Sequence, residues 1–308
     1  MTRHRLIRTT AATGCLALAV ALTGCGSDEP VDPGTGTDTE TTVPTGTVTP
    51  TASPSDGEEP TPTTTDDAGG GEISGVPVYY VGDSGGSFRL YREWRTVPDL
   101  GDPVESAVMA MMTVTPLDPD YSTPWVAPDE LEVEREGSSI TVDVSPDAFS
   151  GSVGSELSAL ALQQLVYTAT AASTLDGPAA TTVTILMDGE ASDAWGHVRV
   201  GEPTTRAPQA EVFSHVWILS PAEGQEVGAG EVAISGYGTS FEANFLWRVD
   251  GPAGTEEGFT LSDNGMGFGE FEFTVDLEPG TYTVTVESTS GMGEGFVPHT
   301  DSKTFTVR

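Results

Sequence analysis

Cys25 is the residue of this chain whose surroundings specify a reaction most clearly. It directly follows Leu22, Thr23 and Gly24 in the order of a lipobox. Before them stand a short apolar run, residues 16–22, and a basic start that contains Arg3, Arg5 and Arg8. This is the order of a bacterial export signal that is cut before the cysteine, which then carries diacylglycerol and an acyl chain such as palmitate. We therefore expect residues 1–24 to be a lipoprotein signal peptide and Cys25 to be the lipidation site.

Two other interpretations of this segment stay open, namely a plain secretory signal with an incidental cysteine and an uncleaved anchor. The apolar run is shorter than the ~20 residues that a membrane-spanning helix needs, which favours the lipoprotein. Cys15 would be removed with the signal, so Cys25 would be the only cysteine left. An internal disulfide, a thiol nucleophile within the folded part and a cysteine metal site are then excluded.

Ser84 lies in Gly82-Asp83-Ser84-Gly85-Gly86, which matches the nucleophile loop of trypsin-like serine proteases. That chemistry needs a histidine and then an aspartate before the serine. The only histidine before Ser84 is His4, within the expected signal peptide. We therefore interpret the motif as a glycine-rich turn, expect no catalytic residue and predict that the chain is not an enzyme.

Metal-binding patterns are weak. The histidines that remain after cleavage are far apart and have no metal-ligand spacing: His197, His215 and His299. The pairs Asp99/Asp102 and Asp118/Asp120 leave a calcium site open, but neither follows the spacing of a calcium loop. We expect no metal site and no cofactor apart from the lipid on Cys25.

Aromatic side chains provide the remaining candidate binding residues. Tyr121 and Trp125 lie in a proline-rich loop, where they could form a patch for a sugar or a protein partner. Alternatively, they fold back over the sheet and cover the core. Glu242 is a third candidate, for binding or for accepting a hydrogen bond from a turn amide.

The chain is strongly acidic, with a formal net charge of −35. Three of its basic residues lie in the expected signal, so nine basic against 47 acidic residues remain, which leaves −38. Such a surface repels nucleic acid and anionic lipid headgroups, so we expect no nucleic-acid partner. Residues 25–71 are rich in Thr, Pro, Gly and acidic residues, and they predict a disordered tether that starts at the lipidated cysteine.

Residues 72–201 predict an α+β domain with a mixed sheet and two helices. Strands are expected at 76–81, 88–97 and 181–187, with a turn at 82–87 and a hairpin formed by 131–135 and 140–144. The first helix has Asp102 as its N-cap and Pro103 at its first position, and it ends at Thr115-Pro116. The second helix is expected at 153–175.

After a short linker at 202–211, the pattern changes to alternating apolar residues separated by turns. About seven short strands within residues 212–308 are typical of an all-β, immunoglobulin-like sandwich. The inter-sheet disulfide of antibody domains would be missing here.

Several segments of the first domain resemble the GerMN domain of sporulation, germination and actinobacterial envelope proteins. They are Phe88-Arg89-Leu90-Tyr91, Gln163-Gln164-Leu165-Val166-Tyr167-Thr168 and residues 183–189. Residues 218–224 and 234–244, which contain Phe241-Glu242-Ala243, resemble the immunoglobulin-like domain of bacterial spore germination proteins. The resemblance implies a non-catalytic envelope module that assembles with proteins.

These observations together predict a non-catalytic lipoprotein on the extracytoplasmic face of the cell membrane. Its GerMN-like domain would bind or assemble with envelope proteins or with itself, and the sandwich would be a spacer or a second binding surface. The alternative is a module that binds peptidoglycan glycan or peptide. An envelope hydrolase has the least support.

Overall fold

The computed structural model describes residues 71–290 and 297–308. Leu22, Thr23, Gly24 and Cys25 lie outside this range, as does the expected tether up to residue 70. The described chain contains an α+β region, whose strands and helices lie between Glu72 and Arg199, and a β-sandwich, whose strands lie within 216–288 and 300–307. Both belong to one compact unit that ends at Arg308. No described helix is long and apolar enough to cross a membrane.

A long hairpin opens the α+β region. Strand β1 (Glu72–Ser84) pairs with β2 (Ser87–Pro98) over its length, and with the short β3 (Tyr121–Ser122) on its other side. The expected turn at 82–87 is therefore wrong in extent. Only Gly85 and Gly86 form the turn, with φ of 65° and 85°. Two successive positive φ values suit the tight two-residue turn that continues the twist of both strands.

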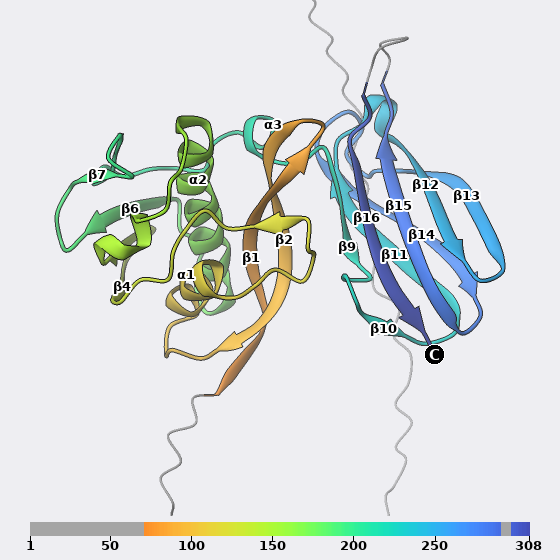
Figure 1. Cartoon of the computed structure of the whole chain (residues 1–308), viewed down its shortest axis with the longest axis horizontal. Coiled ribbons are helices and arrows are strands. Elements are labelled where there is room, and N and C mark those ends of the chain that lie inside the picture. Colours follow the sequence, from red (N-terminus) through yellow and green to blue (C-terminus); the bar gives the residue numbers. More distant parts are fainter. Residues whose placement is uncertain (1–70, 291–296) are drawn as a thin grey trace, which may run out of the picture. The chain divides into compact units, whose positions relative to one another are not determined.

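Two helices cover this hairpin. Helix α1 (Pro103–Thr113) begins at Asp102, whose side chain accepts hydrogen bonds from the amides of Val104 and Glu105, as the sequence predicted. Helix α2 (Ser155–Ala172) continues into a short 3-10 turn at 173–175. Both helices lie between the β1/β2 hairpin and a second sheet (Figure 1).

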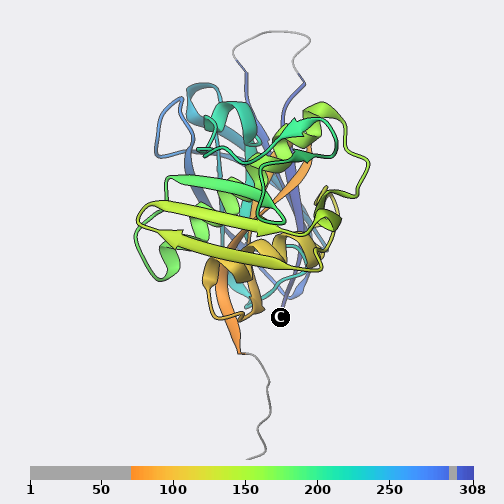
Figure 2. The ribbon, with the colours of Figure 1, turned by 90° about the vertical axis from the view of Figure 1, so that its left-hand side faces the viewer.

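The second sheet has the order β4-β5-β6, from β4 (Leu131–Glu136), β5 (Ser139–Val144) and β6 (Thr182–Met187). The predicted 131–144 hairpin is present, and β6 lies parallel to β5 (Figure 2). The short strands β7 (Asp193–Ala194) and β8 (Val198–Arg199) follow. In the expected linker at 202–211, Thr204 bonds to Val183 of β6, and helix α3 (Gln209–Val212) begins at Gln209.

The β-sandwich has two sheets. One has the order β14-β11-β9, from β9 (Val216–Ser220), β11 (Gly230–Gly238) and β14 (Gly269–Leu277). The other has the order β10-β16-β15-β12-β13, from β10 (Glu226–Val227), β12 (Asn244–Gly251), β13 (Gly254–Leu261), β15 (Gly280–Ser288) and β16 (Thr300–Val307). Their inner faces pack around Phe245, Phe271 and Phe305, which are fully buried.

The core of the α+β region continues beyond its last strand. Phe213 and Trp217 belong to the same buried cluster as the residues of β1, β2 and the two helices. Phe213 lies 4.7 Å from Tyr167 and 5.3 Å from Trp217, measured between ring centroids. Trp217 is on β9, so this strand of the sandwich contributes its side chain to the core of the first region.

Candidate functional site

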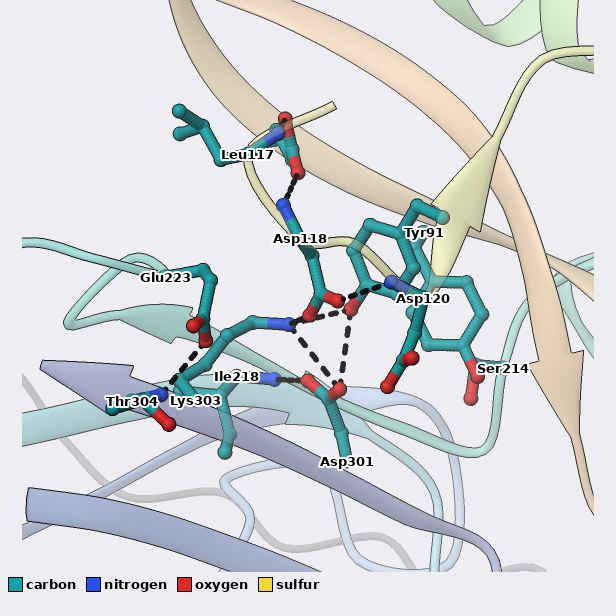
Figure 3. A network of polar contacts seen from close by, with 12 residues as sticks. Tyr91, Leu117, Asp118, Asp120, Ser214, Ile218, Glu223, Asp301, Lys303 and Thr304 are labelled. Carbon is teal, nitrogen blue, oxygen red and sulfur yellow. Dashed lines mark hydrogen bonds and ion pairs between the residues drawn. The ribbon is translucent and has the colours of Figure 1, made fainter. Parts of the chain in front are cut away.

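Lys303 is the centre of a buried polar network between the two regions (Figure 3). Its ammonium group forms an ion pair with Asp118 and lies 3.2 Å from Asp301 Oδ1. It also donates to the Tyr121 hydroxyl at 2.8 Å, and that hydroxyl donates to Asp301 at 3.2 Å. Lys303 is only 4% exposed, and its three partners are also buried. The network therefore replaces the water that these charged groups would otherwise need.

Hydrogen bonds of backbone amides hold both acidic residues of the network in place. Asp118 donates its amide to Glu93 Oε1 at 3.0 Å, and Glu93 forms an ion pair with Arg95 at 2.5 Å. On the sandwich side, Asp301 Oδ2 accepts the amide of Ile218 at 2.6 Å. The network thus joins β2, the loop before β3, β9 and β16.

Burial shifts the ionisation of these groups. Burial lowers the pKa of Lys303, but Asp301 and Asp118 outweigh it, so the pKa is raised above its usual value. Burial raises the pKa of Asp301, against the opposing effect of Lys303. It also raises the pKa of Tyr121 well above its usual value. A lysine attacks substrates only when it is neutral. With a raised pKa and three partners, Lys303 is suited to an ion pair and not to nucleophilic catalysis.

Ser84 lies beside a histidine that its position in the chain does not suggest. Its hydroxyl is 2.9 Å from His299 Nδ1 and 3.0 Å from the Ser214 hydroxyl. The serine-protease pattern places its histidine before the serine, so it gives no sign of this contact with a residue 215 positions later. Ser84 is 2% exposed, however, so a substrate carbonyl has no access to its hydroxyl.

His299 stacks on His215 with 4.0 Å between ring centroids. Burial, followed by the charge of the neighbouring His299, lowers the pKa of His215 to about 4. Burial and the charge of Arg89 lower that of His299. Both rings are therefore neutral at neutral pH, which allows two imidazoles to stack without charge repulsion.

The structure does not bring the three candidate binding residues together. Tyr121 belongs to the Lys303 network and stacks on Tyr91 at 4.3 Å. Trp125 is buried against Phe149 and donates its indole N–H to the carbonyl of Ala161 at 3.2 Å. Both rings are buried, as the alternative in which they cover the core requires. Neither ring is exposed enough to form a sugar-binding patch. Glu242 is exposed in the 3-10 turn at 241–243, with φ of 54°.

The Gln163–Thr168 segment has a structural use that the sequence did not reveal. Gln164 donates to the carbonyl of Tyr79 at 2.9 Å, and the amide of Tyr79 donates to the Thr168 hydroxyl at 3.1 Å. Tyr167 donates to the carbonyl of Ala207 at 2.6 Å. These side chains of α2 therefore satisfy backbone groups of β1 and of the chain leading to α3.

In each of the two carboxylate pairs considered for calcium, one carboxylate already has other partners. Asp102 caps α1 and also lies 3.3 Å from Arg135, while Asp118 is paired with Lys303. Within residues 71–290 and 297–308, no three histidine, cysteine or acidic side chains gather as metal ligands would.

Comparison with known families accounts for both regions. Residues 77–193 match the family model described as sporulation and spore germination, and residues 215–293 match the one described as the immunoglobulin-like domain of bacterial spore germination. The chain carries a GerMN domain followed by a germination-type immunoglobulin-like domain. The resemblance inferred from the sequence is thus confirmed for both domains. Neither matched family is known as an enzyme family.

Solved structures with some similarity include the tandem GerMN domains of the sporulation protein GerM from Bacillus subtilis. The identity is 14% and the TM-score 0.35, over 49% of this chain and 50% of that chain. An engineered protein matches with 17% identity and a TM-score of 0.25, over 48% of this chain and 36% of that one. The chain thus spans half of the first structure and about a third of the second. No curated protein gives a significant match.

Proposed function

We propose that this chain is a non-catalytic lipoprotein, held on the extracytoplasmic face of the cell membrane by lipid on Cys25. Its GerMN domain binds or assembles with envelope proteins or with further copies of the chain. The immunoglobulin-like domain is a spacer or a second binding surface.

The observation that carries this proposal is the order of parts along the chain. A lipobox, Leu22 to Cys25, is followed by a tether without large apolar residues and then by two germination-type domains. A lipid at the start of such a tether keeps a folded module near a membrane while leaving it room to meet partners.

The two side chains that come nearest to a catalytic arrangement, Ser84 and Lys303, have structural roles, which supports a non-catalytic function. Ser84 is buried beside Ser214 and His299, and Lys303 is charged within its ion-pair network. Both are occupied in holding the two domains together.

The anchoring proposal is tested by metabolic labelling with an alkyne analogue of palmitate in an actinobacterial host. The full chain should be labelled and found in the membrane fraction. Cys25→Ser should be unlabelled and should accumulate as the uncut precursor, whereas Cys15→Ser should behave as the wild type. Labelling of Cys25→Ser equal to that of the wild type would rule out Cys25 as the lipidation site.

The assembly proposal needs its own measurement. Crosslinking of the tagged full chain in the same cells should give defined products with envelope proteins or with a second copy. A chain that stays uncrosslinked while a known envelope complex in the same cells is captured would contradict an assembly role.

A further inference from the structure

Three apolar side chains are exposed together on the outer face of the immunoglobulin-like domain. Leu246 on β12 is 44% exposed, and Phe259 and Leu261 on β13 are 68% and 58% exposed. Leu246 lies directly opposite Phe259 in the strand pairing, and Leu261 follows two positions later on the same face. Adjacent exposed apolar side chains of this size are typical of interaction sites. We call these three residues, with the neighbouring edge of β13, the β13 surface.

Strand β13 is also the end of its sheet. In the order β10-β16-β15-β12-β13 it pairs with β12 alone among the described strands (Figure 1). Alternate residues of β13 thus present their backbone N–H and C=O groups along the outer edge. Such an edge is a template for one more strand, and chains commonly protect it with charged side chains, above all lysine, with proline or with a bulge. The eight residues of β13 contain neither lysine nor proline, and their only charges are those of Glu256 and Glu257, which repel acidic strands and attract basic ones.

Carboxylates surround the β13 surface. Glu256 and Glu257 lie on β13 itself. Glu272 lies on the neighbouring strand β14, and its backbone carbonyl accepts a hydrogen bond from the Thr260 hydroxyl of β13 at 2.7 Å. Glu287 on β15 is opposite Leu246 on its other side. The nearby base, Arg248, is already paired with Asp250 at 2.9 Å. The apolar centre therefore has an acidic rim.

A hollow adjoins these residues. It has a volume of about 470 Å³ and is lined by Leu246, Trp247, Arg248, Glu257, Thr285 and Glu287, among others. It offers an apolar wall with carboxylates on two sides, which suits a side chain with an aliphatic stem and a cationic end.

Charge decides between the three available occupants. A second copy would bring another acidic chain, with a formal net charge of −35 in full length, against the same acidic rim. The tether is no better, because residues 26–70 contain acidic residues but no Lys or Arg. A basic segment of another protein is the occupant that both the rim and the apolar centre favour.

We propose that the β13 surface binds an extended, basic segment of a partner protein as an additional strand. Side chains on the outer face of that segment pack on Phe259 and Leu261, next to Leu246, and its lysine or arginine side chains pair with Glu256, Glu257 and Glu272. The segment's backbone continues the sheet beyond β13. This inference rests on the proposed role of the immunoglobulin-like domain as a second binding surface, but it does not depend on lipidation at Cys25.

The test uses two synthetic nine-residue peptides with valine at alternate positions, one with lysine and one with glutamate between the valines. Binding to the full chain, purified in mild detergent, is measured by fluorescence anisotropy. The lysine peptide should bind at least ten times more tightly than the glutamate peptide, and less tightly as NaCl rises from about 50 to about 300 mM. On binding, backbone amides of β13 should become protected from hydrogen exchange.

Phe259→Ser should weaken the binding of the lysine peptide at least tenfold. Phe88→Ser is the matched control, because Phe88 is a 45% exposed phenylalanine of the GerMN domain, and it should have no effect. Equal binding of both peptides, or binding that Phe259→Ser leaves unchanged, would overturn the proposal. Self-association that strengthens with salt and is lost in Phe259→Ser would also overturn it, by identifying a second copy as the occupant. Neither result would affect the labelling test of Cys25.

Discussion

Lys303 shows how one charged residue can fix the contact between two domains. Removal of a cation from water is costly, and the cost is recovered only when its partners are well placed. Asp118 comes from the loop before β3, whereas Asp301 lies two residues before Lys303 on β16. The pair therefore forms only when the GerMN domain and β16 lie together.

Lys303→Met tests this network, because methionine keeps the aliphatic volume but leaves Asp118 and Asp301 buried without their cation. We expect the free energy of unfolding to fall by about 3–5 kcal/mol, measured by urea denaturation. Arg248→Met removes an exposed partner of Asp250 and should cost less than about 1 kcal/mol. A loss for Lys303→Met as small as that of the control would show that the network contributes little.

The stacked histidines predict a pH dependence of stability. The pKa of His215 is lowered to about 4 in the folded chain, against about 6.5 in an unfolded one. The unfolded chain therefore binds the proton first, and the stabilising contribution is lost as pH falls from about 6.5 towards 4. The groups that face this ring are His299, Arg89 and Phe268.

Thermal unfolding at pH 7.5 and pH 4.5 measures this effect. The Tm of the wild type should fall further from pH 7.5 to pH 4.5 than the Tm of His215→Phe. This variant keeps an aromatic ring stacked on His299, but the ring cannot be protonated. The carboxylates titrate in both proteins, so the difference between them isolates the histidine. An equal loss of Tm in both would contradict the assignment to His215.

At the scale of elements, α2 supports β1 through side chains as well as through packing. Where β3 no longer pairs with β1, the amide and carbonyl of Tyr79 are bonded to Thr168 and Gln164. A buried strand edge without such partners would be costly.

Thr168→Val removes the hydroxyl and preserves the shape of the side chain, which leaves the amide of Tyr79 buried without an acceptor. We expect a loss of about 1–3 kcal/mol in unfolding free energy and faster hydrogen exchange of that amide. Thr113→Val is the control, since the Thr113 hydroxyl bonds its own helix at Met109 in an exposed position. Unchanged exchange at Tyr79 would show that Thr168 is not its acceptor in solution.

Local signals explain which elements the sequence could predict. The start of α1 follows from Asp102 and Pro103, and the β4/β5 hairpin follows from a turn with Gly137 between alternating residues, so both were predicted closely. The partners of Lys303 and Ser84 could not be predicted in this way. Asp118 is 185 residues from Lys303, and His299 is 215 residues from Ser84, so nothing in their local sequence indicates the contact. Only the packing of the two domains creates these pairs.

At the scale of the whole molecule, the described part of the chain has a core that crosses the domain boundary. Trp217 is a residue of the sandwich strand β9, yet it packs against Tyr91 and Phe213 within the GerMN core. The contact between the domains therefore combines apolar packing around Trp217 with the buried ion pairs of Lys303. Two domains joined in this way should unfold together, as a single cooperative transition.

Trp217→Ala should separate the two domains. Its indole N–H has no hydrogen-bond partner among the described residues, so the substitution removes packing alone. We expect a loss of about 3–5 kcal/mol and two resolved transitions in differential scanning calorimetry, where the wild type shows one. Ile234→Ala creates a cavity within the core of the sandwich and should lower the single transition without splitting it, because the contact between domains is intact. If Trp217→Ala also unfolds in one transition, with equal calorimetric and van't Hoff enthalpies, then Trp217 does not couple the domains, and the charged network alone must hold them together.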